Sequence, residues 1–322
     1  MLLTTAHKMG MWILTGFLGV LTIFFNTYIL LMGLRNYRQS HHWTPCETII
    51  TGLALQNVAH QVFSYFWMSM DQLDHECKYR ILYAVLTVIV LSLKFSIMWT
   101  TAFLVFYYAT KLVIEPIHCY TRIQEVILKH VLTVVIVIPI CGFSICVPLI
   151  TTITAENITW LDDCSIMPED FVGQMYGGFC VLVSDVIPGV LIFKSSISIT
   201  VHLAIHLQHM KASTNGFHTP KLGSEMRVIR MNLFLVVIFL SFLIVDIYSH
   251  YVILMKDENL LSLTVLFSSM YTSLCALVLI YGKKTFWKNL LHLYNLFLDD
   301  YPCLGCLKVP ETKRVHNQAP HH

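Results

Sequence analysis

The segment MGMWILTGFLGVLTIFFNTYILLMGL, residues 9–34, decides the fold, because it runs for 26 residues without a charged side chain. A helix of roughly 20 apolar residues crosses the hydrocarbon core of a bilayer and bonds all its backbone groups internally. This run is too long for the core of a signal peptide, and no small-residue cleavage site follows it. We therefore predict a retained membrane helix.

Six more apolar runs follow, at about residues 47–70, 79–107, 125–150, 177–205, 230–254 and 260–281. The composition agrees, since 56% of the residues are hydrophobic and only 12% are charged, which leaves no room for a large aqueous domain. The sequence predicts an all-α membrane protein in which seven transmembrane helices form one bundle over residues 9–282.

The basic residues orient this bundle in the membrane. Fifteen of the 21 lysines and arginines fall in the segments of one side and four in those of the other, while Lys94 and Lys194 lie within spans. Cytoplasmic loops carry the excess of basic residues, so residues 1–8 are expected outside and residues 299–322 form a cytoplasmic tail. The sequon Asn157-Ile158-Thr159 falls outside, which makes Asn157 a glycosylation candidate.

Residues 283–298 are too short and too polar to span. Their apolar side chains recur at helical spacing, which predicts an amphipathic helix on the inner leaflet: Phe286, Leu290, Tyr294 and Phe297. Cys303 and Cys306 follow this helix. They are either palmitoylation sites, for which a juxtamembrane position is usual, or free thiols in the tail.

Charged residues inside the spans are the strongest local signal of function. An ionised Lys94 in the middle of the third span costs about 2.5 to 3.5 kcal/mol on insertion scales unless it has a partner. Asp185, one turn before Pro188, is the natural partner, and Asp246 is the second choice. Such a pair either contacts a ligand or only fastens the helices together.

The segment around the third inner loop resembles the bitter taste receptor (taste receptor type 2) family. The family's histidine, methionine, Gly-Phe pair, proline and basic residue are matched without a gap by His206, Met210, Gly216-Phe217, Pro220 and Arg230. The resemblance extends to the fifth and third spans through Pro188, Phe95-Ser96, Thr101 and Phe106-Tyr107. It touches most of the transmembrane chain, and it is highly specific only around the third inner loop.

The resemblance implies a seven-transmembrane-helix G-protein-coupled receptor rather than an enzyme. Such a receptor lies in the plasma membrane as a multi-pass protein and detects small bitter compounds from outside. It then activates a heterotrimeric G protein of the gustducin/Gi type. No cofactor or metal is expected, and the net charge of +2 offers no basic surface for nucleic acid.

Several positions depart from the family pattern. Mammalian members have tryptophan and asparagine ligand contacts on the third span, where this chain has Ile89 and Leu93, and Lys283-Lys284 replaces the Asn-Pro after the seventh span. This indicates a divergent, non-mammalian type of member. Cys77 and Cys164, both expected outside, form either the disulfide found in vomeronasal type 1 receptors or two unpaired thiols.

We place the candidate ligand pocket in the outer halves of spans three, five, six and seven. Its candidate residues are Ile89, Leu93, Lys94, Asp185, Phe242, Asp246, Tyr248 and His250. The candidate residues for G-protein contact lie at the inner ends of spans three, five and six: Tyr107, Lys111, His206, Met210, Arg227 and Arg230. Arg227 and Arg230 equally suit plain anchoring at lipid headgroups.

Three other classes stay open at this point. A vomeronasal type 1-like pheromone receptor is the nearest alternative. A polytopic membrane oxidoreductase would use His202, His206 and His209, but no second histidine box of that spacing accompanies them. A transporter is disfavoured because seven spans do not divide into equal repeats.

Overall fold

The computed structural model of the chain describes residues 2–73, 78–112, 122, 125–126, 129–150, 171–213, 223–256, 261–300 and 308–309. Every secondary-structure element within these residues is helical. In chain order they are α1 (Leu2–Ser40), α2 (Pro45–Leu73), α3 (Arg80–Leu112), α5 (Val131–Cys146), α7 (Phe171–Val181), η1 (Leu182–Val186), α8 (Ile187–Ser213), α9 (Gly223–Lys256), α10 (Leu261–Gly282) and α11 (Lys284–Asp299).

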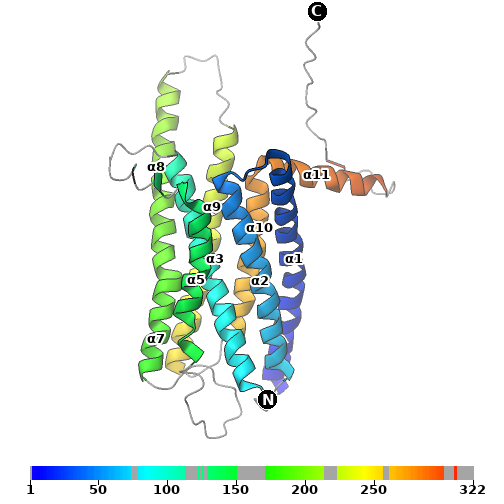
Figure 1. The fold of residues 1–322 in the computed structure, drawn as a ribbon, viewed down its shortest axis with the longest axis vertical. Coiled ribbons are helices and arrows are strands. Elements are labelled where there is room, and N and C mark those ends of the chain that lie inside the picture. The colour runs from blue at the N-terminus through cyan, green and yellow to red at the C-terminus, as the bar shows by residue number, and fades with distance from the viewer. Residues whose placement is uncertain are drawn as a thin grey trace, which may run out of the picture.

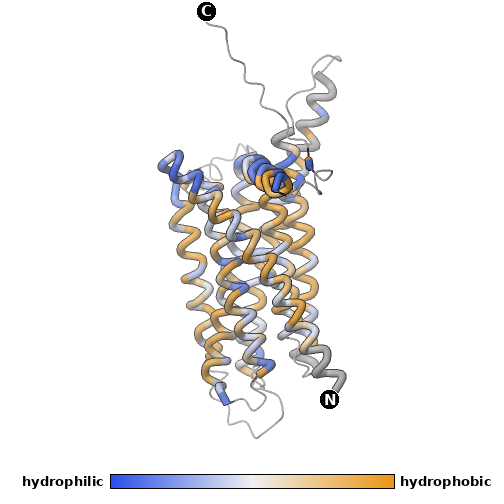
Figure 2. The backbone as a smooth tube through the Cα atoms, turned by 90° about the vertical axis from the view of Figure 1, so that its right-hand side faces the viewer, coloured by the Kyte–Doolittle hydropathy of each residue, from blue (hydrophilic) through white to orange (hydrophobic). Residues whose placement is uncertain are grey.

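Within the described residues, seven helical rods run side by side, and α7, η1 and α8 count as one because they form a continuous rod (Figure 1). The chain enters at one end of the bundle and α11 lies at the other, as an odd number of crossings requires (Figure 1). Apolar residues dominate the middle of the rods, and hydrophilic residues collect near their ends (Figure 2). This banding matches a bilayer with water on both sides.

Among the described residues, five rods are long and apolar enough to cross a membrane by length and composition: Met9–Ser40, Ile81–Lys111, Phe171–His202, Met226–Val252 and Leu261–Gly282. The other two predicted spans are α5, which has only 16 helical residues, and α2. Helix α2 is long, but it carries a polar stripe that includes Asn57, His60, Gln61 and Ser64, all buried in the bundle. A span that faces protein rather than lipid can keep such residues.

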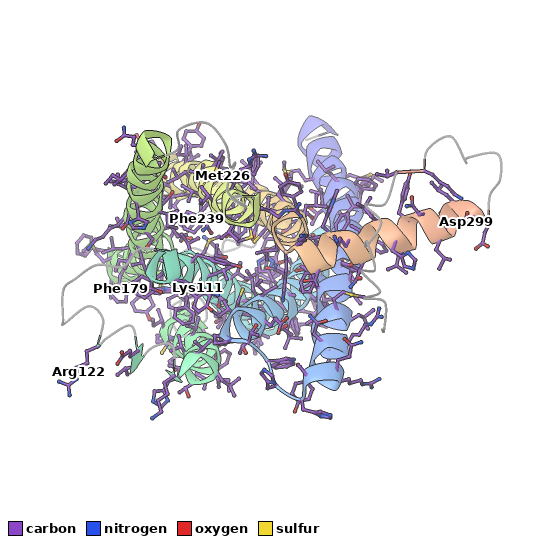
Figure 3. All side chains as sticks on the ribbon, turned by 90° about the horizontal axis from the view of Figure 1, so that it is seen from above. Lys111, Arg122, Phe179, Met226, Phe239 and Asp299 are labelled. Carbon is purple, nitrogen blue, oxygen red and sulfur yellow. The ribbon has the colours of Figure 1, made fainter. Side chains whose placement is uncertain are left out.

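The helix bounds differ from the sequence prediction at both ends of the chain. Helix α1 begins at Leu2, seven residues before the predicted span, and α11 covers 284–299 instead of 283–298. Helix α11 lies across the axis of the bundle and projects away from it, with Asp299 at the far end (Figures 1 and 3). Its base is fixed where the Tyr28 hydroxyl donates to the carbonyl oxygen of Phe286 at 2.7 Å.

Candidate functional site

Three charged side chains meet in the bundle interior, toward the end opposite α11. The ammonium nitrogen of Lys94 on α3 lies 2.6 Å from Asp246 Oδ2 on α9 and 3.2 Å from Asp185 Oδ2 on η1. None of the three side chains is more than 5% exposed. The sequence offered Asp185 and Asp246 as alternative partners, and the structure brings both to Lys94. We call these three residues the Lys94 cluster.

A break in the helix pattern places Asp185 in this cluster. Pro188 has no backbone N–H to donate, and just before it the chain forms a π-helical turn in which the Ile187 N–H bonds to Leu182 O. This shift frees the carbonyl of Val183, and the indole nitrogen of Trp99 on α3 donates to it at 3.0 Å. The turn therefore aims Asp185 at α3 and is fastened there by a second residue of α3.

Aromatic rings and one imidazole surround the Lys94 cluster. The Phe242 ring centroid lies 5.7 Å from Lys94 Nζ, within the range of a cation–π contact. Phe242 packs on Tyr271 of α10, whose hydroxyl donates to Thr101 Oγ1 at 3.0 Å. His250 Nδ1 lies 3.7 Å from Asp246 Oδ2 and 2.9 Å from the carbonyl oxygen of Asp246.

A small cavity reaches Lys94 from the side of α2 and α10. Residues of α2, α3 and α10 line it: His60, Trp67, Thr87, Val90, Leu91, Lys94, Leu261, Thr264, Val265 and Ser268. We predicted a pocket among spans three, five, six and seven. That pocket stays a prediction; this cavity lies beside span two, and none of the described residues that line it belongs to span five or six.

Only some of the predicted pocket residues lie together in the structure. The structure brings together Lys94, Asp185, Phe242, Asp246 and His250. Ile89 and Leu93 are half-buried on α3 and do not line the cavity. Tyr248 is 58% exposed, so its side chain lies on the outside of the bundle and away from the cluster.

The sequence did not lead us to predict the residues that span two contributes to the cavity beside Lys94. His60 is buried, and its Nε2 lies 3.2 Å from Ser268 Oγ on α10. Trp67 donates its indole N–H to Thr87 Oγ1 on α3 at 2.9 Å. A signal was present, because Asn57, His60, Gln61 and Ser64 stand at positions i, i+3, i+4 and i+7 of a predominantly apolar run.

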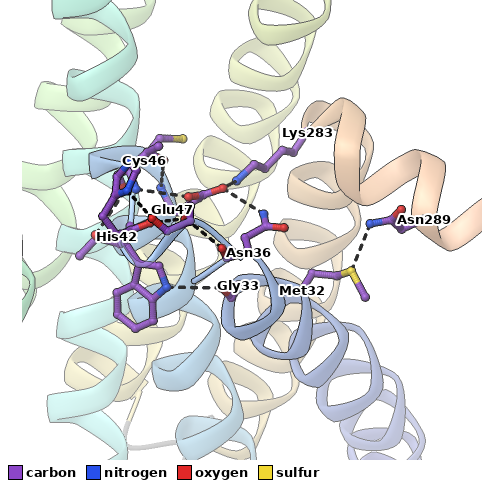
Figure 4. Close-up of polar contacts among 12 residues, drawn as sticks. Met32, Gly33, Asn36, His42, Cys46, Glu47, Lys283 and Asn289 are labelled. Atoms are coloured by element: carbon purple, nitrogen blue, oxygen red, sulfur yellow. Dashed lines mark hydrogen bonds and ion pairs between the residues drawn. The ribbon is translucent and has the colours of Figure 1, made fainter. Parts of the chain in front are cut away.

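A second ionic contact joins the helices at the end that carries α11 (Figure 4). Lys283, between α10 and α11, lies 2.6 Å from Glu47 Oε1 on α2. The same oxygen accepts from Asn36 Nδ2 of α1 at 3.1 Å, and Glu47 Oε2 accepts from the Thr44 N–H at 3.2 Å. We call Asn36, Thr44, Glu47 and Lys283 the Glu47 clasp.

The predicted G-protein contacts lie at this same end. Tyr107 is buried, whereas Lys111 and Arg230 are exposed (Figure 3 labels Lys111). The Arg227 guanidinium lies 5.8 Å from the ring centroid of Tyr281 on α10. His206 and Met210 belong to α8, and their side chains lie outside the described set.

Five residues with predicted modifications also lie outside the described residues: Cys77, Asn157, Cys164, Cys303 and Cys306. The glycosylation, disulfide and palmitoylation assignments therefore stay predictions.

A bundle of seven helical rods within the described residues, with a buried polar cluster toward one end and an amphipathic helix across the other, agrees with the predicted class of G-protein-coupled receptors. Within that class, the family model described as "Taste receptor protein (TAS2R)" matches residues 2–296, and the chain belongs to this family of bitter taste receptors. No curated protein matches the chain.

Membership confirms several predictions made from the sequence. The chain is a multi-pass membrane receptor and not an enzyme, and its family binds bitter ligands and couples to G proteins. The vomeronasal, oxidoreductase and transporter alternatives are set aside by the same match. The end of the bundle that carries α11 is the cytoplasmic one, so the Lys94 cluster belongs to the outer half.

Proposed function

We propose that agonists of this receptor bind beside the Lys94 cluster in the outer half of the bundle, and that the inner end activates a G protein of the gustducin/Gi type. One observation carries the first part. A buried ammonium group on α3 is shared by carboxylates from two other rods, at 2.6 and 3.2 Å. Intramembrane charges are expensive, and they usually mark ligand or ion pathways.

The cluster is placed to couple a ligand to helix movement. Lys94, Asp185 and Asp246 belong to three rods, so a molecule that alters their distances changes how α3, η1 and α9 pack. An agonist can shift this equilibrium only by the difference between its affinities for the two arrangements. The cavity beside Lys94 supports the same location because it adjoins the cluster.

The inner ends of the same rods support the second part of the proposal. Lys111 and Arg230 are exposed there, on α3 and α9. Arg227 rests against Tyr281, so a displacement of α9 changes a contact with α10. A partner that docks on Lys111 and Arg230 would therefore sense the movement of α9 relative to α3.

A calcium-mobilisation screen tests the function directly. Cells that carry the receptor and a gustducin-like chimeric Gα are exposed to a broad panel of bitter compounds, beside cells that carry the chimera alone. We expect receptor-dependent calcium responses to at least one compound. Where the receptor signals through native Gi proteins, we expect pertussis toxin to abolish the response. Silence across the panel, with surface expression proven by labelling, contradicts the proposal.

Charge exchange distinguishes ligand contact from a purely structural role. Lys94→Asp with Asp246→Lys keeps the ionic contact and reverses its direction. If agonist potency and surface expression of the double variant both equal those of the unmodified receptor, the cluster is structural. If surface expression equals that of the unmodified receptor and agonist potency is lost, the agonist contacts these side chains. The matched control is Glu47→Lys with Lys283→Glu, which reverses an ion pair at the inner end.

A further inference from the structure

A second lysine lies within a span, and it faces the opposite way from Lys94. Lys194 belongs to α8, in one of the apolar rods, and its side chain is exposed. The buried face of α8 at this level is formed by Ile192, Ser195 and Ile199, and Lys194 lies on the other side of the helix. No described residue forms an ion pair or a hydrogen bond with its ammonium group. An ionised side chain that faces lipid without a partner is costly, and charges within spans usually point into the bundle.

Contacts of α8 with α9 fix the depth of Lys194. Ile199, five residues further along α8, packs in one cluster with Ile229, which is followed by the exposed Arg230 at the inner end of α9. At a rise of 1.5 Å per residue, Lys194 lies about 7.5 Å further into the membrane than Ile199. Exposed apolar residues, among them Ile197, follow it toward the inner end of the rod. Lys194 therefore lies within the hydrocarbon core, in the inner half of the bilayer.

The direction of α8 turns this side chain away from the inner headgroups. In a helix each Cα–Cβ bond tilts toward the N-terminus. The N-terminal end of α8 joins η1, which carries Asp185 of the outer-half cluster, so the Cα–Cβ bond of Lys194 tilts toward the middle of the bilayer. The lysine stem must bend back against this tilt to reach a phosphate of the inner leaflet. A carboxylate that another membrane helix holds near the same depth lies in the favoured direction.

Lys194 also occupies the centre of a regular stripe on the outside of α8. Exposed residues recur there at spacings of three, four, three and four, and we call them the α8 stripe: Ile187, Val190, Lys194, Ile197 and Val201. Two packed membrane helices meet along seams of this spacing, and a single lysine in such a seam selects the register and the partner. The rod lies at the edge of the bundle (Figure 1). Among the five long apolar rods of the described residues it is the least covered, because 22% of its most apolar window is buried, against 39% to 67% in the others.

A second copy of this chain does not complete the α8 stripe. Two α8 helices packed symmetrically would bring the Lys194 side chains of both copies together, and like charges in contact are unfavourable. The described acids lie in the Lys94 cluster, toward the ends of the bundle, or on α11 and at its end: Glu47, Asp71, Glu125, Asp185, Asp246, Asp299 and Asp300. None of these acids is exposed at the depth of Lys194, so the carboxylate has to come from a different protein.

We propose that the α8 stripe is the docking face for a single-span membrane protein whose helix carries one aspartate or glutamate at the depth of Lys194. The carboxylate pairs with the Lys194 ammonium in a charge-assisted hydrogen bond, while the apolar side chains on both sides of it pack against the partner helix. The pair replaces a charge that faces lipid with a neutral, hydrogen-bonded contact between two helices. The inference is independent of the agonist site, because the stripe lies on the outside of the bundle.

A designed membrane helix tests the chemistry of this face. The probe is a single-span peptide of about 22 leucine, valine and alanine residues with one glutamate near its middle, and the matched probe carries glutamine there. Resonance energy transfer from the labelled peptide to the full-length receptor, labelled at its C-terminus in phosphatidylcholine vesicles, measures association. We expect the glutamate peptide to bind about threefold to thirtyfold more tightly than the glutamine peptide, the range that one polar contact between membrane helices provides.

Variants locate the contact. Lys194→Met should remove the preference for the glutamate peptide, and Lys194→Arg should keep it. Lys288→Met, at an exposed position of α11, is the matched control and should leave the preference unchanged. Ile197→Trp should weaken binding of both peptides severalfold because it obstructs the stripe, whereas Phe234→Trp on the exposed side of α9 should not.

The outcomes decide between a partner helix and a lipid headgroup. Equal binding of the two peptides to the unmodified receptor overturns the proposal, and this comparison needs no variant. A preference that survives in Lys194→Met, or full binding to Ile197→Trp, places the contact elsewhere and also overturns it. Mass spectrometry of the receptor from vesicles that contain phosphatidylserine tests the headgroup. If the receptor retains this lipid, loses it in Lys194→Met and no longer prefers the glutamate peptide in its presence, the occupant is an anionic lipid and the proposal is wrong.

Discussion

The outer and inner halves of the bundle each contain an ionic contact between helices, and the two are built differently. In the Glu47 clasp one acid faces one base, every carboxylate oxygen is paired, and the side chains of Glu47 and Lys283 keep 12% and 20% exposure. In the Lys94 cluster two acids share one base, two oxygens have no hydrogen-bond partner among the described residues, and exposure is 5% or less. A complete pair suits a fixed junction, whereas an incomplete one suits a site that another molecule completes.

The difference also follows from where the two contacts lie. The Glu47 clasp joins α1, α2 and the start of α11 near the inner surface, where water screens the charges and lowers the cost of burial. The Lys94 cluster lies deep among three rods, where each ion loses its hydration. Substitutions should therefore have larger effects in the outer cluster than in the inner clasp.

Lys94→Met should have the largest effect. It leaves two buried carboxylates without their cation, which costs about 3–5 kcal/mol of stability and removes most receptor from the cell surface. Surface labelling and the melting temperature of the solubilised receptor measure it. Lys194→Met is the matched control, because Lys194 is exposed on α8. Normal expression of Lys94→Met would show that the cluster is dispensable for folding.

Gly282→Ala should come next. Gly282 precedes the clasp residue Lys283, and a Cβ atom there would lie 2.0 Å from Met231 Sδ and 2.9 Å from Met231 Cβ on α9. Overpacking of this kind costs about 1–3 kcal/mol. Thermal melting should show the loss, and the same change should cost less in a Met231→Ala background. Gly177→Ala, which meets nothing within 4 Å, should be silent, and an equal loss at both glycines would disprove the steric explanation.

Glu47→Gln should have a smaller effect, about 1 kcal/mol, because the pair is partly exposed and the amide can still bond to Asn36 or Thr44. A shift of a few degrees in the melting temperature is the expected result. Glu47→Lys combined with Lys283→Glu should recover part of the loss. A penalty as large as that of Lys94→Met would contradict the distinction between the two contacts.

Asp299→Asn should have the smallest effect. Its partner Lys308 is 45% exposed and Asp299 itself is 56% exposed, and pairs of this kind contribute little. We expect a melting temperature within experimental error of the unmodified receptor, at low and at high salt. A clear, salt-dependent loss would mean that this pair helps to hold the end of α11.

Much of the architecture could be predicted from local sequence. The apolar run at 9–34 and the spacing of Phe286, Leu290, Tyr294 and Phe297 indicated the membrane helix and the amphipathic helix because both depend on residues within a few turns. The site was harder to predict. Lys94 had two candidate partners at similar depth, and Tyr248 stood near Asp246 in sequence yet faces outward.

What the sequence determined by itself is the number of spans, their orientation and the membership in the bitter receptor family, because hydrophobic length, basic loops and contiguous motifs are properties of the chain alone. Only the tertiary structure decided that Lys94 meets both aspartates, that a π-helical turn aims Asp185, and that span two lines the cavity. These depend on the rotation of one helix against another, which is set by packing between distant segments and cannot be read from one segment alone.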